Sequence, residues 1–144
     1  MARIDHLGRL IDHVHLVVRD IEVSRRFYRA VLNAIGRELT YEAPDCFACD
    51  ELFVSSAPEV GAHFTGPHRV HLAFQASDRE SVSRFFSAAV SAGGRDNGAA
   101  GERSYHPNYY AAFVLDPDGN NIEAVHHGRG TRSAASVAIT IDDT

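Results

Sequence analysis

Apolar and polar residues alternate in two short stretches that open similar halves of the chain. In the stretch from Leu10 to Val18, the apolar residues Val14, Leu16 and Val18 lie on one face, and His13, His15 and Val17 lie on the other. The same alternation recurs over residues 70–75, where His71 takes the polar face. Alternation with period 2 is typical of a half-buried β-strand. We therefore predict two strands, each carrying a histidine on its polar face.

A helical pattern follows each of these strands. Asp20 is a suitable N-cap for the first helix, and Gly36 ends it. Ser77 and Glu80 form a capping box for the second helix, which the glycine pair at 93–94 ends. The apolar positions at helical spacing are Val23, Phe27, Tyr28, Val31, Leu32 and Ile35 in the first helix, and Val82, Phe85, Phe86, Ala89 and Val90 in the second.

Shorter strands are predicted after each helix. In the first half they span residues 37–42, 45–50 and 51–56, and in the second half 109–115 and 121–127. Residues 97–107 have the composition of a loop, and the turn sequence Asp116-Pro117-Asp118-Gly119 joins the last two strands. Apolar residues recur with period 2 at Val137, Ile139 and Ile141, so the tail is either an extra edge strand or a mobile end.

The two halves are copies of one unit. A shift of 58 residues places His13 on His71, and nine of 25 positions from 13 to 37 are then identical. Average residue usage would give about one or two identities. We therefore predict one α+β domain over residues 1–144, made of two tandem βαβββ modules. The first module spans 10–56, a linker 57–68, the second module 69–127, and a tail or edge strand 128–144.

Composition excludes several classes of protein. The 144 residues are 44% hydrophobic, enough for a buried core, and the net charge of -5 argues against a nucleic-acid partner. No apolar run approaches the ~20 residues of a membrane span, and the first ten residues do not resemble a secretory signal. We expect a cytoplasmic protein. Cys46 and Cys49 form a CxxC without a second pair, and the alternation around them favours two thiols on opposite faces of a strand over a metal or redox site.

Three residues are candidate metal ligands. If the two modules pack as related copies, His13 and His71 come from matching strands and converge. Glu123 is an acid within an otherwise apolar strand, where a carboxylate is costly to bury without a cation or a donor. Two histidines and one carboxylate leave coordination positions open on Fe(II), Mn(II) or a similar ion. The alternatives are ordinary core or rim histidines and a glutamate paired with an arginine.

The chain resembles the vicinal oxygen chelate superfamily, which includes glyoxalase I, fosfomycin-resistance transferases, extradiol dioxygenases and bleomycin-resistance proteins. The motifs that carry the resemblance are residues 11–18 followed by Asp20 and Phe27-Tyr28, the strand at 71–74, and the sequence from Asp116 to Glu123. The resemblance covers about residues 10–127. It implies a curved, partly closed mixed β-sheet around a metal cavity with the helices outside.

The resemblance also implies a ligand set and a range of functions. It assigns a divalent ion, Fe(II), Mn(II), Zn(II) or Ni(II), to His13, His71 and Glu123. Where glyoxalase I has a fourth, acidic ligand, this chain has Leu52-Phe53-Val54-Ser55-Ser56, which argues against the glutathione-linked isomerase reaction. A metal-dependent enzyme that chelates a small oxygen-rich substrate is favoured. The alternative is a metal-free protein that sequesters a small molecule, as bleomycin-resistance proteins do.

Other residues are candidates for contact with a substrate. His15 lies two residues beyond His13 on the same face, where it is either a general base or a cavity-lining histidine. Tyr105, His106, Tyr109 and Tyr110 cluster before a strand, and we expect at least one of them to reach the pocket. Arg69 and Arg103 are candidate anion ligands, although solvated surface arginines are the commoner case. Small chains of this superfamily commonly form homodimers, so we expect one here.

Overall fold

The chain folds into two compact units, one of residues Met1–Ile21, Glu38–Thr65 and Thr131–Thr144, the other of Glu22–Arg37 and Gly66–Gly130. The computed structural model describes residues 3–7, 11, 13–56, 69–128, 134 and 136–141. Helix α1 (Ile21–Ala34) follows the first histidine strand in the sequence, yet all but its first residue belong to the second unit. The compact units therefore do not coincide with the two sequence copies. The predicted linker 57–68 lies outside the described residues.

The first unit contains a four-stranded sheet in the order β2-β5-β4-β3. Strand β2 (Val14–Val18) runs parallel to β5 (Leu52–Ser56), and β4 (Cys46–Cys49) joins β5 to β3 (Tyr41–Ala43) by antiparallel pairing. The strand predicted from Leu10 begins only at Val14, so His13 precedes it. Cys46 is partly exposed and Cys49 is buried, as alternation along a strand predicts, and no disulfide joins these two described residues.

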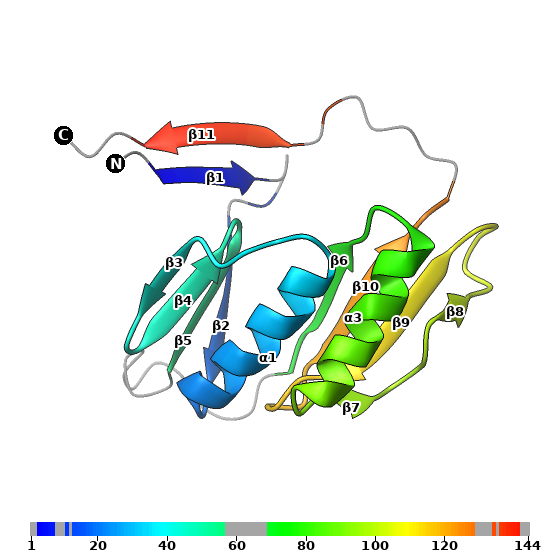
Figure 1. The fold of residues 1–144 in the computed structure, drawn as a ribbon, viewed down its shortest axis with the longest axis horizontal. Helices are drawn as coiled ribbons and strands as arrows, with labels where there is room; N and C mark the ends of the chain where they lie inside the picture. Colours follow the sequence, from blue (N-terminus) through cyan, green and yellow to red (C-terminus); the bar gives the residue numbers. More distant parts are fainter. Residues whose placement is uncertain are drawn as a thin grey trace. The chain divides into compact units, whose positions relative to one another are not determined.

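The tail forms a strand with an unexpected partner. Strand β11 (Val137–Ile141) pairs antiparallel with β1 (Arg3–Leu7), and the two form a sheet of their own (Figure 1). Of the two alternatives left open for the tail, an edge strand or a mobile end, the structure has a strand at 137–141. Strand β1 was not predicted, because its two apolar residues, Ile4 and Leu7, are three positions apart and so do not alternate.

The second unit contains a five-stranded sheet in the order β6-β10-β9-β7, with β8 also paired to β9. Strand β10 (Asn121–His126) lies parallel to β6 (His71–Gln75) and antiparallel to β9 (Tyr110–Leu115). The predicted loop at 97–107 contains β8 (Gly101–Glu102), and β7 (Arg95–Asp96) precedes that loop. These two-residue strands carry little sequence signal of their own, because pairing with β9 is what orders them.

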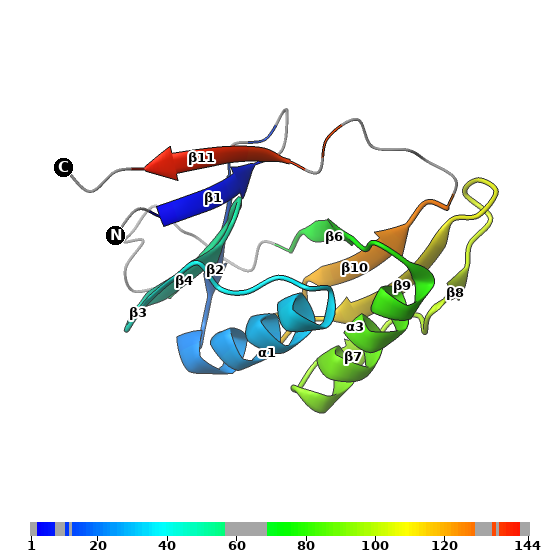
Figure 2. The same cartoon turned by 45° about the horizontal axis from the view of Figure 1, so that its top comes forward.

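Helices α1 and α3 (Arg79–Ser91) lie side by side in both views of the second unit (Figures 1 and 2). The hydroxyl of Tyr28 on α1 donates to Oδ2 of Asp116, 2.5 Å away in the turn after β9. Burial and the Asp116 charge raise the pKa of Tyr28 well above its usual range, so the hydroxyl stays protonated. Val23 and Val90, both part of the apolar pattern of their helices, are 46% exposed.

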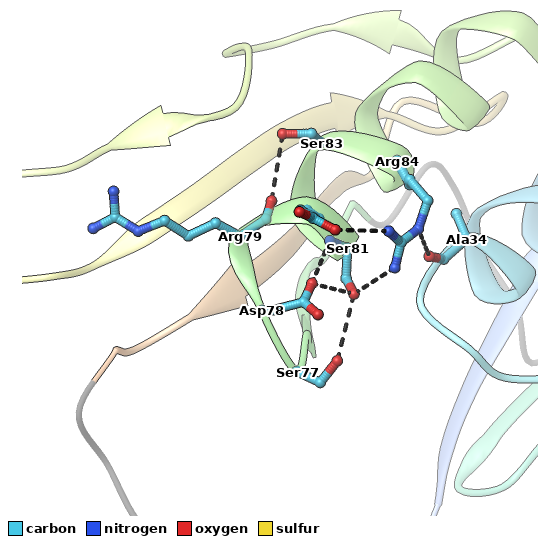
Figure 3. Close-up of polar contacts among 8 residues, drawn as sticks. Ala34, Ser77, Asp78, Arg79, Ser81, Ser83 and Arg84 are labelled. Atoms are coloured by element: carbon cyan, nitrogen blue, oxygen red, sulfur yellow. Dashed lines mark hydrogen bonds and ion pairs between the residues drawn. The ribbon is translucent and has the colours of Figure 1, made fainter.

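The cap of α3 differs from the predicted one. Asp78, not Ser77, is the N-cap residue, and its Oδ1 accepts hydrogen bonds from the backbone N–H and the hydroxyl of Ser81, each at 2.7 Å (Figure 3). The Ser77 hydroxyl contacts only that of Ser81, at 3.4 Å. The helix therefore begins one residue later than the capping box predicted, and an aspartate serves the same purpose as the serine.

The predicted α+β class is confirmed: the described residues combine helices α1 and α3 with two larger sheets, in which each copy supplies one parallel strand pair, β2 with β5 and β6 with β10. Backbone hydrogen bonds connect the described strands as separate sheets and not as one continuous sheet. None of the described helices is long and apolar enough to cross a membrane.

Candidate functional site

One face of the second unit's sheet carries the predicted site residues. Glu123 on β10 pairs with Ala73 on β6 and with Phe113 on β9, and His71 on β6 pairs with Asn121. Residues paired across strands lie on the same face of a sheet, so His71, Glu123 and Phe113 share one face. We call it the site face. On the opposite face, the apolar residues Ala112, Val114, Ile122 and Ala124 have no exposed area.

Glu123 is the buried acid at the centre of the site face. Its side chain is 2% exposed, and Oε2 lies 3.0 Å from Nε2 of His71, whose side chain is 53% exposed. Its other oxygen, Oε1, accepts a short hydrogen bond from the Tyr109 hydroxyl. A carboxylate in an apolar strand needs such donors, because burial without partners disfavours the charged form. The prediction that a buried Glu123 needs a polar partner is confirmed, and its described partners are a histidine and a tyrosine, not an arginine.

Tyr109 connects this acid to a group of aromatic rings. Its ring packs against the cluster of Ala111, Phe113 and Val125 and contacts the rings of Tyr105, His106 and His127. Burial, followed by the hydrogen bond to Glu123 and its charge, raises the pKa of Tyr109 to about 12. The phenol is therefore protonated at neutral pH and donates to the carboxylate.

Two residues were not singled out as site residues by sequence reasoning. His127 lies next to Tyr109, and its Nδ1 is 2.9 Å from Nε2 of His106. Phe113 lies against His71, with ring centroids 6.0 Å apart. Period 2 counted from Glu123 reaches His127, so the alternation itself was a usable signal. Phe113 gave none, because a phenylalanine in a strand is expected on either face.

The pair of His71 and Glu123 has the chemistry and spacing of two metal ligands. Imidazole and carboxylate suit divalent ions of the iron to zinc series. Two donors held at right angles by bonds of about 2.1 Å lie about 3 Å apart, and the two donor atoms here are 3.0 Å apart. Within the described part of either unit, no three His, Cys, Asp or Glu side chains are close enough to hold an ion. The pair therefore fits part of a ligand set.

The other predicted histidines belong to the first unit. His13 is exposed and immediately precedes β2, and its convergence with His71 and Glu123 stays a prediction. Nε2 of His15 lies 2.7 Å from the Ser55 hydroxyl, and its ring packs against Phe53 with centroids 4.8 Å apart. Burial, followed by the nearby His13, lowers the pKa of His15, which favours the neutral imidazole.

The register explains the missing fourth ligand. His15 on β2 pairs with Phe53 on β5, as its counterpart Ala73 on β6 pairs with Glu123 on β10. Phe53 therefore occupies the position in the first copy that the acid occupies in the second. The two copies differ at this point in chemistry, because one carries an aromatic ring where the other carries a carboxylate.

Tyr110, also a candidate for contact with a substrate, does not lie on the site face with Glu123 and Tyr109. It alternates with Tyr109 and Ala111, so its ring lies on the opposite face of β9, with the guanidinium of Arg79 4.7 Å from its centroid. Glu102, which pairs with Tyr110, binds the same guanidinium at 2.8 Å. Of the residues proposed to contact a substrate, Tyr109 is the one that lies beside Glu123.

The fold and this site define a class of α+β proteins in which a parallel strand pair presents a histidine and a glutamate on one face. The sequence profile of the Glyoxalase/Bleomycin resistance protein/Dioxygenase superfamily matches residues 10–124. The chain belongs to this superfamily, and the resemblance drawn from its motifs is confirmed.

Solved structures with this fold come from several bacteria. A glyoxalase/bleomycin resistance protein from Albidiferax ferrireducens is 26% identical, with 82% of this chain and 98% of that chain covered and a TM-score of 0.66. A glyoxalase-related enzyme from Fulvimarina pelagi is 20% identical, and the match covers 92% of this chain and 98% of that chain with a TM-score of 0.67. A lactoylglutathione lyase from Agrobacterium tumefaciens is 20% identical, and the match covers 83% of this chain and 94% of that chain with a TM-score of 0.59. No curated protein matches the chain significantly.

Proposed function

We propose that the protein is a metal-dependent vicinal oxygen chelate enzyme that acts on a small oxygen-rich substrate. The proposed ligands of the divalent ion are His13, His71 and Glu123. The observation that carries the proposal is the His71–Glu123 pair, in which a buried carboxylate and an accessible imidazole hold their donor atoms 3.0 Å apart. Membership of a superfamily that includes glyoxalases and dioxygenases supports it.

A bound divalent ion would supply Lewis acid chemistry that stabilises negative charge on a substrate oxygen. The chain's own groups would position that oxygen and manage protons. Tyr109 orients Glu123 through its hydroxyl and has a proton to donate. His15, which favours the neutral form, is proposed to accept a proton from the substrate or to hydrogen-bond it.

A metal-free binding protein is the second candidate function. Both oxygens of Glu123 have protein donors, His71 for one and Tyr109 for the other, so the carboxylate is satisfied by the chain itself. Such a pocket would bind a small molecule by hydrogen bonds and aromatic contacts without an ion. The two candidates differ in metal content, which makes them easy to separate.

The test is calorimetric titration of the chelator-treated protein with Mn(II), Ni(II) and Zn(II), and with Fe(II) under anaerobic conditions. We expect one ion per chain, and Glu123→Gln should weaken binding by more than about 100-fold, because it removes an anionic ligand while keeping the side chain's shape. The matched control is His126→Gln, which alters a histidine of the same strand on the opposite face. A wild-type protein that binds none of the four ions would favour the metal-free candidate.

A further inference from the structure

On the site face, the ring of Phe113 contacts the cationic side chain of Arg103 as well as His71. The guanidinium carbon of Arg103 lies 5.4 Å from the ring centroid of Phe113, and the same ring lies 6.0 Å from that of His71. Arg103 directly follows β8, whose Gly101 pairs with Ala111 on β9. Phe113 is thus flanked by Arg103 and by the His71–Glu123 pair, and all four residues belong to the second unit.

The loop before Arg103 is shaped around its guanidinium. One terminal nitrogen donates to the Ala99 carbonyl at 2.7 Å and the other to the Glu102 carbonyl at 3.3 Å. A side chain added at Gly98 or Gly101 would come within 3.2 or 3.1 Å of these nitrogens. The backbone of the loop therefore fixes the cation in place, and no carboxylate among the described residues takes part in holding it.

The charge of Arg103 is not compensated within the described residues. Two other arginines of this unit pair with acids, Arg79 with Glu102 at 2.8 Å and Arg25 with Glu22 at 3.2 Å. Arg103 is half-buried, and its described contacts are two backbone carbonyls and an aromatic ring. A guanidinium has five N–H donors, so three remain for a ligand. A fixed, partly desolvated cation with donors to spare favours an anion.

We propose that Arg103 binds the anionic group, a carboxylate or a phosphonate, of a substrate whose other oxygens lie at the His71–Glu123 pair. This inference rests on the proposed function and adds the substrate class, a small organic acid. Such a molecule would extend from the His71–Glu123 pair past the edge of the largely buried Phe113 ring, with its charged end at Arg103. The structural alternative is that Arg103 binds no ligand and only stabilises the loop from 98 to 102.

The test uses two simple anions and no metal. Chelator-treated protein is titrated with acetate and with methylphosphonate at constant ionic strength, and NMR follows the side-chain Nε–H signals of the arginines. We expect the Arg103 signal to shift with one or both anions, and the anion with the higher affinity identifies the preferred group. Because metal is absent, this result is independent of the metal titration, and either proposal can fail without the other.

Matched variants separate binding from loop stability. Arg103→Gln should weaken anion binding at least about tenfold, and Arg103→Lys, which keeps the charge but loses the planar donor array, should weaken it less. Arg79→Gln is the control, because Arg79 also lies over a β9 ring but on the opposite face. The proposal is overturned if Arg103→Gln binds the anions as well as the wild type, or if the Arg103 signal of the wild type does not move. The shift of the Arg103 Nε–H signal in the wild type tests anion binding even if a variant fails to fold.

Discussion

Glu123 stands out in the sequence as an acid among apolar residues, and its tertiary contacts make it the centre of the candidate site. Its sequence neighbours are apolar, which suggested a partner but not which one. The partners, His71 and Tyr109, lie 52 and 14 residues away in the chain and reach the carboxylate through the pairing of β10 with β6 and β9. Sequence reasoning could identify the acid, whereas its hydrogen bonds depend on strand register.

At this scale we predict that Tyr109→Phe weakens metal binding by about 10- to 100-fold, the usual effect of losing a group that orients a ligand. The change leaves Oε1 of Glu123 without its phenol donor while the ring remains in place. Calorimetric titration with Zn(II) measures the effect. Tyr105→Phe is the control, because the Tyr105 ring touches Tyr109 and its side chain is 68% exposed. Equal affinities for the two variants would show that Tyr109 does not orient the carboxylate.

At the scale of elements, the start of α3 shows why boundaries are hard to predict. Both Ser77 and Asp78 are good capping residues, and the sequence pattern of a capping box favours the serine. The structure selects Asp78, whose extended backbone lets Oδ1 reach Ser81 (Figure 3). The choice depends on where β6 ends and how the chain enters the helix, which a local pattern does not specify.

We predict that Asp78→Ala lowers the melting temperature at pH 7 and that Ser77→Ala has a smaller effect. Hydrogen bonds from the Ser81 hydroxyl and N–H lower the pKa of Asp78 in the folded protein. The stabilisation is therefore complete above the unfolded pKa of about 3.9 and disappears as the pH falls through the folded value. Thermal unfolding from pH 7 down to pH 2.5 should show the wild type and Asp78→Ala converging at the acid end. A constant difference between them across this range would argue against the cap.

At the scale of the whole molecule, the sheet of β1 and β11 bears on assembly. An isolated two-stranded sheet gains little stability by itself, and Val137 on β11 is 57% exposed. A homodimer, expected from the superfamily, remains a proposal that this exposed apolar residue supports.

We predict that sedimentation at micromolar concentration shows a species of twice the chain mass. Val137→Asp should shift it toward one chain mass, because a charge would be placed among apolar contacts. Thr140→Asp, on the other face of β11, is the control and should leave the dimer intact. A wild-type protein that sediments only at one chain mass would contradict the dimer.

The sequence by itself determined the α+β class, the order of helices α1 and α3 and of most strands, and the superfamily. These follow from local periodicity, turn residues and the 58-residue repeat, which are properties of neighbouring positions. The tertiary structure alone decided that Glu123 binds His71 and Tyr109, that Tyr110 faces away, and that α1 belongs to the unit of the second copy. It also brought Arg103 over Phe113. These relations join residues distant in sequence, and strand register and packing fix them, because a shift of one residue would turn every side chain of a strand to the other face.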